Sequence, residues 1–133
     1  MEEERTGHCL CGGVSFAVEG KVRPVVYCHC SQCRRQTGLH YAATEVPRDR
    51  LTVAGENLVS WYRASAAAER GFCSRCGSAL FWRQDGNLNI SILAGAFDPP
   101  SGLVGGYHIY CADRGDFYTI NDDLPQYQAG TPS

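Results

Sequence analysis

The chain has little of what marks nucleic-acid binding, membrane insertion or secretion. Only one of its 133 residues is lysine and the formal net charge is −2, so no basic footprint for nucleic acid or an anionic membrane surface is present. No apolar run approaches the length of a membrane span, and the longest, residues 90–97, is predicted as a strand. The first residues lack the basic and apolar segments of a signal peptide. We therefore expect a cytoplasmic protein that binds neither nucleic acid nor membrane.

Several catalytic and organisational patterns are also missing. The sequence contains no Ser/His/Asp arrangement, phosphate-binding loop or dinucleotide fingerprint. It shows no repeat, linker or low-complexity stretch, so we expect a single domain over residues 1–133. Hydrophobic residues make up 44% and charged residues 20%, which are ordinary values for a globular chain. The sequence does not fix an oligomeric state.

The hydrophobic pattern predicts a mainly β fold. Residues 34–37 predict one helical turn, and residues 64–69 fit either a loop or a short helix. Asp85-Gly86-Asn87 predicts a hairpin turn. Short apolar or alternating segments predict strands at residues 14–18, 22–27, 40–46, 51–53, 58–62, 78–83, 88–93 and 107–111.

Cysteine is what the chain has in abundance. It has eight, and seven of them fall into three tight clusters. Thiols stay reduced in the cytosol, and cysteines two positions apart cannot easily bridge each other, so metal ligation is favoured over disulfides. The clusters are Cys9-Leu10-Cys11, Cys28-His29-Cys30-Ser31-Gln32-Cys33 and Cys73-Ser74-Arg75-Cys76.

Two of the clusters are pairs, and together they predict one closed zinc site. Each pair is followed by a glycine, Gly12 or Gly77, which permits the tight turn of a metal-binding knuckle. Four thiolates make the usual tetrahedral site that holds a fold together. The predicted structural ligands are Cys9, Cys11, Cys73 and Cys76.

The remaining cluster, the triplet Cys28, Cys30 and Cys33, predicts a site with three thiolate ligands. An open fourth position would admit water or a substrate thiolate, and zinc lowers the pKa of what it binds. The alternative is a second structural site closed by a distant ligand, for which Cys111 is the obvious candidate. Spacing alone favours neither.

Arg34 and Arg35 follow the triplet directly. One hypothesis is a clamp for a substrate carboxylate beside the metal. A solvated turn, with one arginine balancing the thiolate charge, explains them equally well. For the histidines His8, His29, His40 and His108, a hydrogen-bonded structural role is the safer expectation.

With the flanking residues included, the motifs resemble the glutathione-dependent formaldehyde-activating (GFA) family, which includes the centromere-protein-V type proteins. The resemblance runs from about residue 7 to residue 127. The chain departs from it at Phe117, where relatives often carry Trp, and at Cys111, where an apolar residue is expected. The motifs are Gly7-His8-Cys9-Leu10-Cys11-Gly12-Gly13, Cys28-His29-Cys30-Ser31-Gln32-Cys33-Arg34-Arg35-Gln36-Thr37-Gly38, Gly71-Phe72-Cys73-Ser74-Arg75-Cys76-Gly77-Ser78, Leu93-Ala94-Gly95-Ala96-Phe97-Asp98, His108-Ile109-Tyr110 and Asp123-Leu124-Pro125-Gln126-Tyr127.

The resemblance implies a β-tent fold of small packed antiparallel sheets, stapled by zinc. It implies two zinc ions, one structural and one bound at an open catalytic site formed by Cys28, Cys30 and Cys33. The implied activity is condensation of glutathione, or a similar small thiol, with formaldehyde to S-(hydroxymethyl)glutathione, formally a carbon–sulfur lyase reaction.

Two other functions stay open, because the same fold can host different activities. One is a binding module in which both zinc ions are structural and the β surface docks a protein. The other is a thiol oxidoreductase that uses Cys111, since β-tent methionine sulfoxide reductases pair a zinc site with one reactive cysteine. Those enzymes normally have two complete CxxC pairs, whereas a CxC replaces one of them here.

Overall fold

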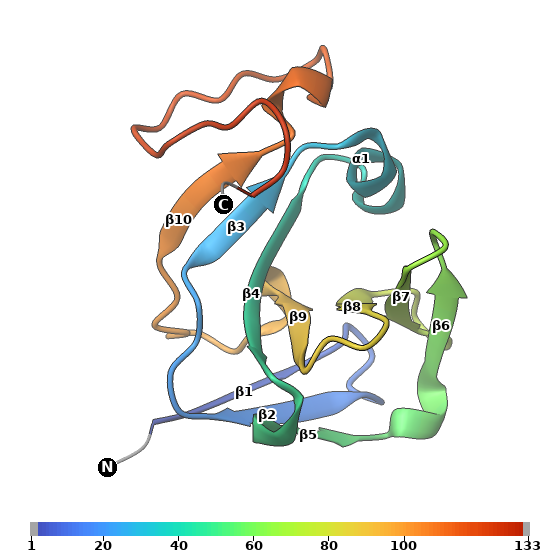
Figure 1. Ribbon diagram of the computed structural model, residues 1–133. Helices are drawn as coiled ribbons and strands as arrows, with labels where there is room; N and C mark the ends of the chain where they lie inside the picture. Colours follow the sequence, from blue (N-terminus) through green and yellow to red (C-terminus); the bar gives the residue numbers. More distant parts are fainter. Residues whose placement is uncertain (1–2, 132–133) are drawn as a thin grey trace.

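The structure, a computed structural model that describes residues 3–131, is built on two β-sheets (Figure 1). The smaller sheet has the strand order β1-β2-β5, with all neighbours antiparallel. Its strands are β1 (Glu4–His8), β2 (Ser15–Glu19) and β5 (Leu51–Ala54). It lies along one side of the molecule, below the larger sheet in the view of Figure 1.

The larger sheet has seven strands in the order β10-β3-β4-β9-β8-β7-β6. All neighbours are antiparallel except β10 and β3, which are parallel, so this sheet is mixed rather than purely antiparallel. The strands are β3 (Val25–Cys28), β4 (Tyr41–Pro47), β6 (Val59–Arg63), β7 (Ala68–Cys73), β8 (Ala79–Gln84), β9 (Asn89–Leu93) and β10 (Gly105–Ile109).

Helical structure is sparse. The α-helix α1 (Ser31–Thr37) connects β3 to β4 and lies at the end of these strands (Figure 1). It is longer than the predicted turn because it begins directly after Cys30. The 3-10 turns are η1 (Arg48–Arg50), η2 (Glu56–Leu58), η3 (Ala94–Ala96) and η4 (Cys111–Asp113). The prediction of a mainly β fold is confirmed.

The main hydrophobic core joins the two sheets. Phe16 of β2 is buried, and its ring meets Phe81 of β8 and Phe97 edge-on, with ring centroids 6.1 and 5.1 Å apart. Gly7 on the neighbouring strand has to be glycine, because a Cβ there would collide with the Phe16 ring and with the Ala96 carbonyl. Burying each phenylalanine contributes about 2–3 kcal/mol to stability. The core therefore fixes the small sheet, and Cys9 at its edge, against the large one.

Two strands are absent from the sequence prediction. Strand β1 carries no alternating apolar pattern, and β7 includes Glu69, Arg70 and Gly71 among its residues. Of residues 64–69, which fitted either a loop or a short helix, residues 64–67 form a loop and residues 68–69 begin β7. Arg70 is only 4% exposed, so β7 buries a charged residue that hydrophobic periodicity cannot detect.

The predicted strand over residues 107–111 is wrong at its end. Strand β10 stops at Ile109, and Tyr110 adopts a left-handed conformation with a φ of 55°. That turn places Cys111 at the start of η4 rather than on the strand. Strand β3 also begins only at Val25, directly after Pro24, which cannot donate a backbone hydrogen bond.

None of the helices in residues 3–131 has the length and hydrophobicity that a membrane span requires.

Candidate functional site

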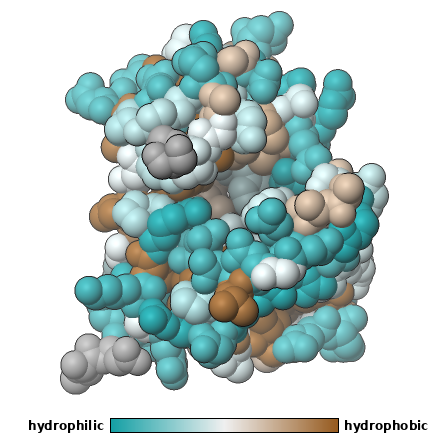
Figure 2. Space-filling view, in the orientation of Figure 1, coloured by the Kyte–Doolittle hydropathy of each residue, from teal (hydrophilic) through white to brown (hydrophobic). Residues whose placement is uncertain are grey.

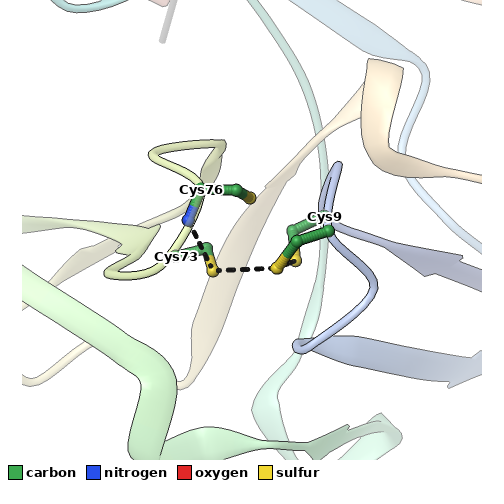
Figure 3. Close-up of side chains that lie close together, drawn as sticks. Cys9, Cys73 and Cys76 are labelled. Carbon is green, nitrogen blue, oxygen red and sulfur yellow. Dashed lines mark hydrogen bonds between the residues drawn. The ribbon is translucent and has the colours of Figure 1, made fainter.

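The first candidate metal centre joins the two sheets. Cys9 directly follows β1 and Cys11 lies in the turn before β2, while Cys73 ends β7 and Cys76 lies in the turn before β8. The four sulfur atoms all lie within 4.8 Å of one another, and Cys9, Cys73 and Cys76 converge on one centre (Figure 3). The fold thus brings together the two pairs that the sequence predicted.

The spacing of these sulfur atoms fits zinc. The Sγ atoms of Cys9 and Cys11 are 3.6 Å apart, and those of Cys11 and Cys73 are 3.8 Å apart. A tetrahedron with Zn–S bonds of about 2.3 Å has edges of about 3.8 Å. Backbone N–H groups donate to three of the sulfurs, namely Val14 to Cys9 at 3.3 Å, Gly13 to Cys11 at 3.4 Å and Cys76 to Cys73 at 3.4 Å.

Hydrogen bonds also stabilise thiolate forms in this cluster. The backbone N–H of Gly13, and after it the Arg75 side chain, lower the pKa of Cys11. Arg75 Nε donates to Cys11 Sγ at 3.3 Å. Hydrogen bonds from Ser78 lower the pKa of Cys76 to about 5. Cys11 and Cys76 thus favour the thiolate form, which is the form of cysteine that ligates a metal ion.

The second candidate metal centre is local. Cys28 ends β3, Cys30 is the N-cap of α1, and Cys33 lies in the first turn of the helix. Their sulfur atoms also lie within 4.8 Å of one another. Cys30 Sγ takes the place of the usual capping oxygen and accepts a hydrogen bond from the Cys33 backbone N–H at 3.3 Å. The helix therefore starts where it does partly because a cysteine caps it.

The three thiols of the triplet differ in acidity. Hydrogen bonds from Cys28, and after it Cys33, lower the pKa of Cys30, so Cys30 ionises first. The hydrogen bond with Cys30, and after it the one with Cys33, raises the pKa of Cys28. A metal ion bound by the three sulfur atoms would displace the thiol protons, and with them these hydrogen bonds, because thiols ligate a metal in the deprotonated form.

Cys111 belongs to neither group of sulfur atoms within residues 3–131. Its side chain is fully buried at the start of η4, and burial raises the pKa of its thiol. Cys111 is therefore a buried thiol in a 3-10 turn and not on a strand as predicted. A raised pKa and a buried sulfur are unfavourable for a nucleophile, because thiolate character and access control cysteine reactivity.

A cavity of about 460 Å³ opens beside the triplet, and Cys28, Cys30 and Cys33 all line it. None of the cysteines of the other centre does so. One face of the large sheet makes up much of its wall, and the face of the molecule seen in Figure 2 is hollowed near its middle. The two centres thus differ: one is a staple between sheets and the other faces an open space.

A row of residues directly opposite one another crosses four strands along this wall. Arg70 of β7 pairs with Trp82 of β8, Trp82 with Ser91 of β9, and Ser91 with Glu45 of β4. All four line the cavity. Neighbouring strands are about 4.8 Å apart, so the row spans about 14 Å.

Arg70 is the basic residue that contacts the triplet. Its guanidinium donates to Cys33 Sγ at 3.2 Å and to the side-chain carbonyls of Gln32 and Gln36, each at 2.9 Å. It also lies 5.1 Å from the centre of the Tyr41 ring. With all three nitrogens engaged and almost no exposure, Arg70 supplies the charge balance that the sequence analysis considered for Arg34 or Arg35.

The predicted clamp residues lie elsewhere. Two arginines, Arg23 and Arg70, line the cavity among the described residues. Neither Arg34 nor Arg35 does so. Arg35 is exposed on α1. Arg34 is partly buried, and its Nε has no hydrogen-bond partner among the described residues. Their role in binding a carboxylate stays a prediction.

His29, which lies between Cys28 and Cys30, begins a chain of hydrogen-bonded side chains whose two histidines are buried. His29 Nδ1 is 2.8 Å from the Tyr118 hydroxyl, and His29 Nε2 is 2.8 Å from His108 Nδ1. His108 Nε2 lies 3.0 Å from an Asp122 carboxylate oxygen. Burial, followed by the charges of His40 and His108, lowers the pKa of His29 to about 4. The expected hydrogen-bonded role is confirmed for His29 and His108.

The Tyr41 hydroxyl is a further feature that the sequence analysis missed. The residue lines the cavity and is 5% exposed, yet its oxygen has no hydrogen-bond partner among the described residues. Burial raises the pKa of this phenol, so it stays protonated. No sequence signal distinguishes it from any other strand tyrosine.

Fold and site together define a class: a small, mainly β protein with one cysteine cluster between its sheets and a second that opens on a cavity. The sequence matches the family described as "Glutathione-dependent formaldehyde-activating enzyme" over residues 4–113. The chain belongs to this family.

Individual relatives agree with that assignment. The chain is 40% identical over 86 residues to a protein of Halomonas elongata whose name provisionally assigns it as a glutathione-dependent formaldehyde-activating enzyme; the match covers 56% of this chain and 53% of the relative. An uncharacterized lyase of Schizosaccharomyces pombe is 29% identical over 86 residues, covering 65% and 62% of the two chains. The chain thus spans little more than half the length of these relatives.

A solved structure shares the fold. A crystal structure of a Rhodobacter sphaeroides protein superimposes with a TM-score of 0.58 at 24% sequence identity. The match covers 75% of this chain and 97% of that one.

Proposed function

We propose that this chain is a zinc-dependent lyase of the carbon–sulfur type that acts on an adduct of glutathione or a similar small thiol. The proposed reaction is addition of the thiol to formaldehyde, giving S-(hydroxymethyl)glutathione, and its reversal. In the forward direction a carbon–sulfur bond forms, the carbonyl oxygen gains a proton, and the thiol loses one. The family and the names of its members support a lyase; the zinc and the substrate are our proposal.

One observation carries this proposal: the three-cysteine centre lines a cavity and the four-cysteine centre does not. A fourth ligand position at the triplet would therefore be accessible to a small molecule, as in catalytic zinc sites. A zinc ion bound there would keep a substrate thiol ionised at neutral pH.

The protein's own residues would contribute positioning and charge balance. Cys28, Cys30 and Cys33 would hold the metal, and Arg70 would offset thiolate charge by its hydrogen bond to Cys33. The walls of the cavity would hold the thiol and the aldehyde near each other, which lowers the entropic part of the barrier. In this proposal, Cys9, Cys11, Cys73 and Cys76 hold a structural zinc.

The proposal predicts two zinc ions of unequal lability, because four thiolates chelate more strongly than three. Mild chelation followed by elemental analysis should remove one equivalent first. Simultaneous loss of both ions would contradict the division into a structural and a catalytic centre.

Catalysis is tested by the rate at which labelled formaldehyde and glutathione reach equilibrium, followed by NMR with zinc-loaded protein. The wild type should exceed the uncatalysed rate, and Cys30→Ser should abolish the excess. A matched Cys111→Ser control should keep it, since Cys111 lies outside both centres. A wild-type rate equal to the uncatalysed one would rule out the proposed reaction.

A further inference from the structure

The cavity carries a charged pair that the proposed chemistry does not use. Tyr41, Ala43 and Glu45 alternate along β4 and all line the cavity, so one face of this strand runs through it. Tyr41 stands opposite Cys28 in the sheet, which places the start of this face beside the triplet. At the other end, Glu45 lies 3.5 Å from Arg23, which also lines the cavity.

Glu45 has unused capacity to accept hydrogen bonds from a cation. Its contacts to Arg23 Nη1 and Asn89 Nδ2 measure 3.5 and 3.4 Å. Close charge-assisted hydrogen bonds are about 2.7–2.9 Å long, so both contacts are loose. The side chain keeps 28% of its surface exposed. Among the described residues that line the cavity, Glu45 is also the only carboxylate.

The neighbouring arginine complements it. Arg23 Nη2 donates to the Ala43 carbonyl at 2.9 Å, which fixes the guanidinium against β4. Its Nε also donates to the Pro24 carbonyl at 3.3 Å, so every guanidinium nitrogen has a partner, but the side chain is 32% exposed whereas Arg70 is buried. A loosely paired cation and anion at one end of a cavity are complementary in charge to a zwitterionic group on a ligand.

We propose that Glu45, with Arg23 beside it, binds the free α-amino acid group of the thiol substrate, Glu45 receiving its ammonium and Arg23 its carboxylate. This inference rests on the proposed function and narrows its substrate class to thiols with a γ-glutamyl head, such as glutathione and γ-glutamylcysteine. Thiols without a free amino group at that distance fit this site poorly.

The distance supports this assignment. Tyr41 and Glu45 are four positions apart on β4, which is about 13 Å at about 3.3 Å per residue. The side chains of Glu45 and Arg23 line the cavity themselves, so the head group does not have to reach the backbone of β4. Two extended residues cover about 7 Å, and the cysteine side chain and the γ-linkage of the glutamyl residue add several more. The head group of a metal-bound glutathione can therefore reach Glu45, whereas that of free cysteine cannot.

The test is calorimetric titration of zinc-loaded protein with two ligands that differ in one group. Glutathione carries the α-ammonium, and glutaryl-cysteinyl-glycine lacks only that ammonium. Glu45→Gln removes the charge with little change in shape. Glu69→Gln is the matched control, because Glu69 is a similarly buried, ion-paired strand residue that does not line the cavity.

Wild-type protein should bind glutathione about tenfold more tightly than the glutaryl analogue, which corresponds to about 1.4 kcal/mol. Glu45→Gln should weaken the binding of glutathione by about the same factor and leave the binding of the analogue unchanged. Glu69→Gln should change the affinity for neither ligand. Such a ligand-by-variant cycle isolates the contact between Glu45 and the ammonium.

Equal binding of both ligands by the wild type would overturn the inference while leaving the proposed function intact. The same conclusion would follow if Glu45→Gln weakened both ligands equally. If neither ligand bound the zinc-loaded wild type, the proposed function would fail and the inference with it. The wild-type comparison needs no variant, so the result does not depend on Glu45→Gln folding.

Discussion

Replacing Arg70 by methionine tests how the buried arginine supports the triplet. The change keeps an unbranched side chain of roughly similar length but removes the charge and all three donated hydrogen bonds. Gln32 is exposed and Gln36 partly so, and their carbonyls can turn to water. Cys33 is buried, so its sulfur would lose the partner that offsets its charge.

The expected cost follows from that difference. Removing one partner of a buried charge pair costs about 3–5 kcal/mol. A metal ion on the same sulfur offsets part of the thiolate charge, so we take the lower end, about 3 kcal/mol. For a domain of this size 1 kcal/mol shifts the Tm by about 3–4 °C, which gives a loss of about 10 °C.

The assay is thermal unfolding of zinc-loaded protein by calorimetry, together with competitive titration of the labile zinc. We expect Arg70→Met to lower both Tm and zinc affinity, the latter by about 10–100-fold as for other groups that orient a metal ligand. Arg35→Met is the matched control, because Arg35 is exposed on the helix that carries Cys33. That control should change stability by less than about 0.5 kcal/mol.

Arg70→Lys should give a Tm and a zinc affinity between those of Arg70→Met and Arg35→Met, since lysine keeps the charge but lacks the planar guanidinium. If Arg70→Met melted within about 2 °C of the wild type and kept its zinc, the assigned charge balance would be wrong. If Arg35→Met were the more damaging variant, the arginine that supports the triplet would be on the helix, as one sequence hypothesis held.

Three further predictions follow from the two centres and the cavity. Cys73→Ala should lower the Tm far more than Cys30→Ala, because the zinc proposed between the sheets would contribute directly to folding; equal losses in thermal melts would contradict the division. Cys111→Val should cost about 1–2 kcal/mol through tighter packing yet keep both zinc equivalents by elemental analysis; loss of one equivalent would show a closed second centre. Tyr41→Phe should leave the unfolding free energy unchanged or raise it by up to about 1 kcal/mol, because it removes an unpartnered buried hydroxyl; a clear loss in chemical denaturation would reveal a partner.

Part of this protein could be predicted from local sequence. The alternation of Phe16 and Val18 with small or polar neighbours predicts the buried face of β2, and the structure confirms it. Alternation is a local property of an extended chain, so it can be recognised in the sequence without knowledge of the fold. The spacing of Cys28, Cys30 and Cys33 likewise predicts one group of three sulfur atoms, because a short loop can hardly separate them.

Segments with little hydrophobic pattern were not predicted. Strand β7 contains Glu69, Arg70 and Gly71, a composition that does not indicate a strand. Its backbone is held in a strand by pairing with β6 and β8. The end of β10 was misplaced because the left-handed backbone of Tyr110 is set by its surroundings rather than by residue type.

The sequence by itself determined which cysteines form the two clusters and the mainly β class, since both follow from spacing and periodicity along the chain. Only the tertiary structure decided which charges surround the triplet. Arg70 and Glu45 reach one cavity through the register of β7, β8, β9 and β4, and Arg23 reaches it through its hydrogen bond to the Ala43 carbonyl of β4. Arg34 and Arg35, adjacent to the triplet in sequence, do not line it. The physical reason is that strand pairing joins residues far apart in the chain, and a single sequence carries no local signal for which of them will face each other.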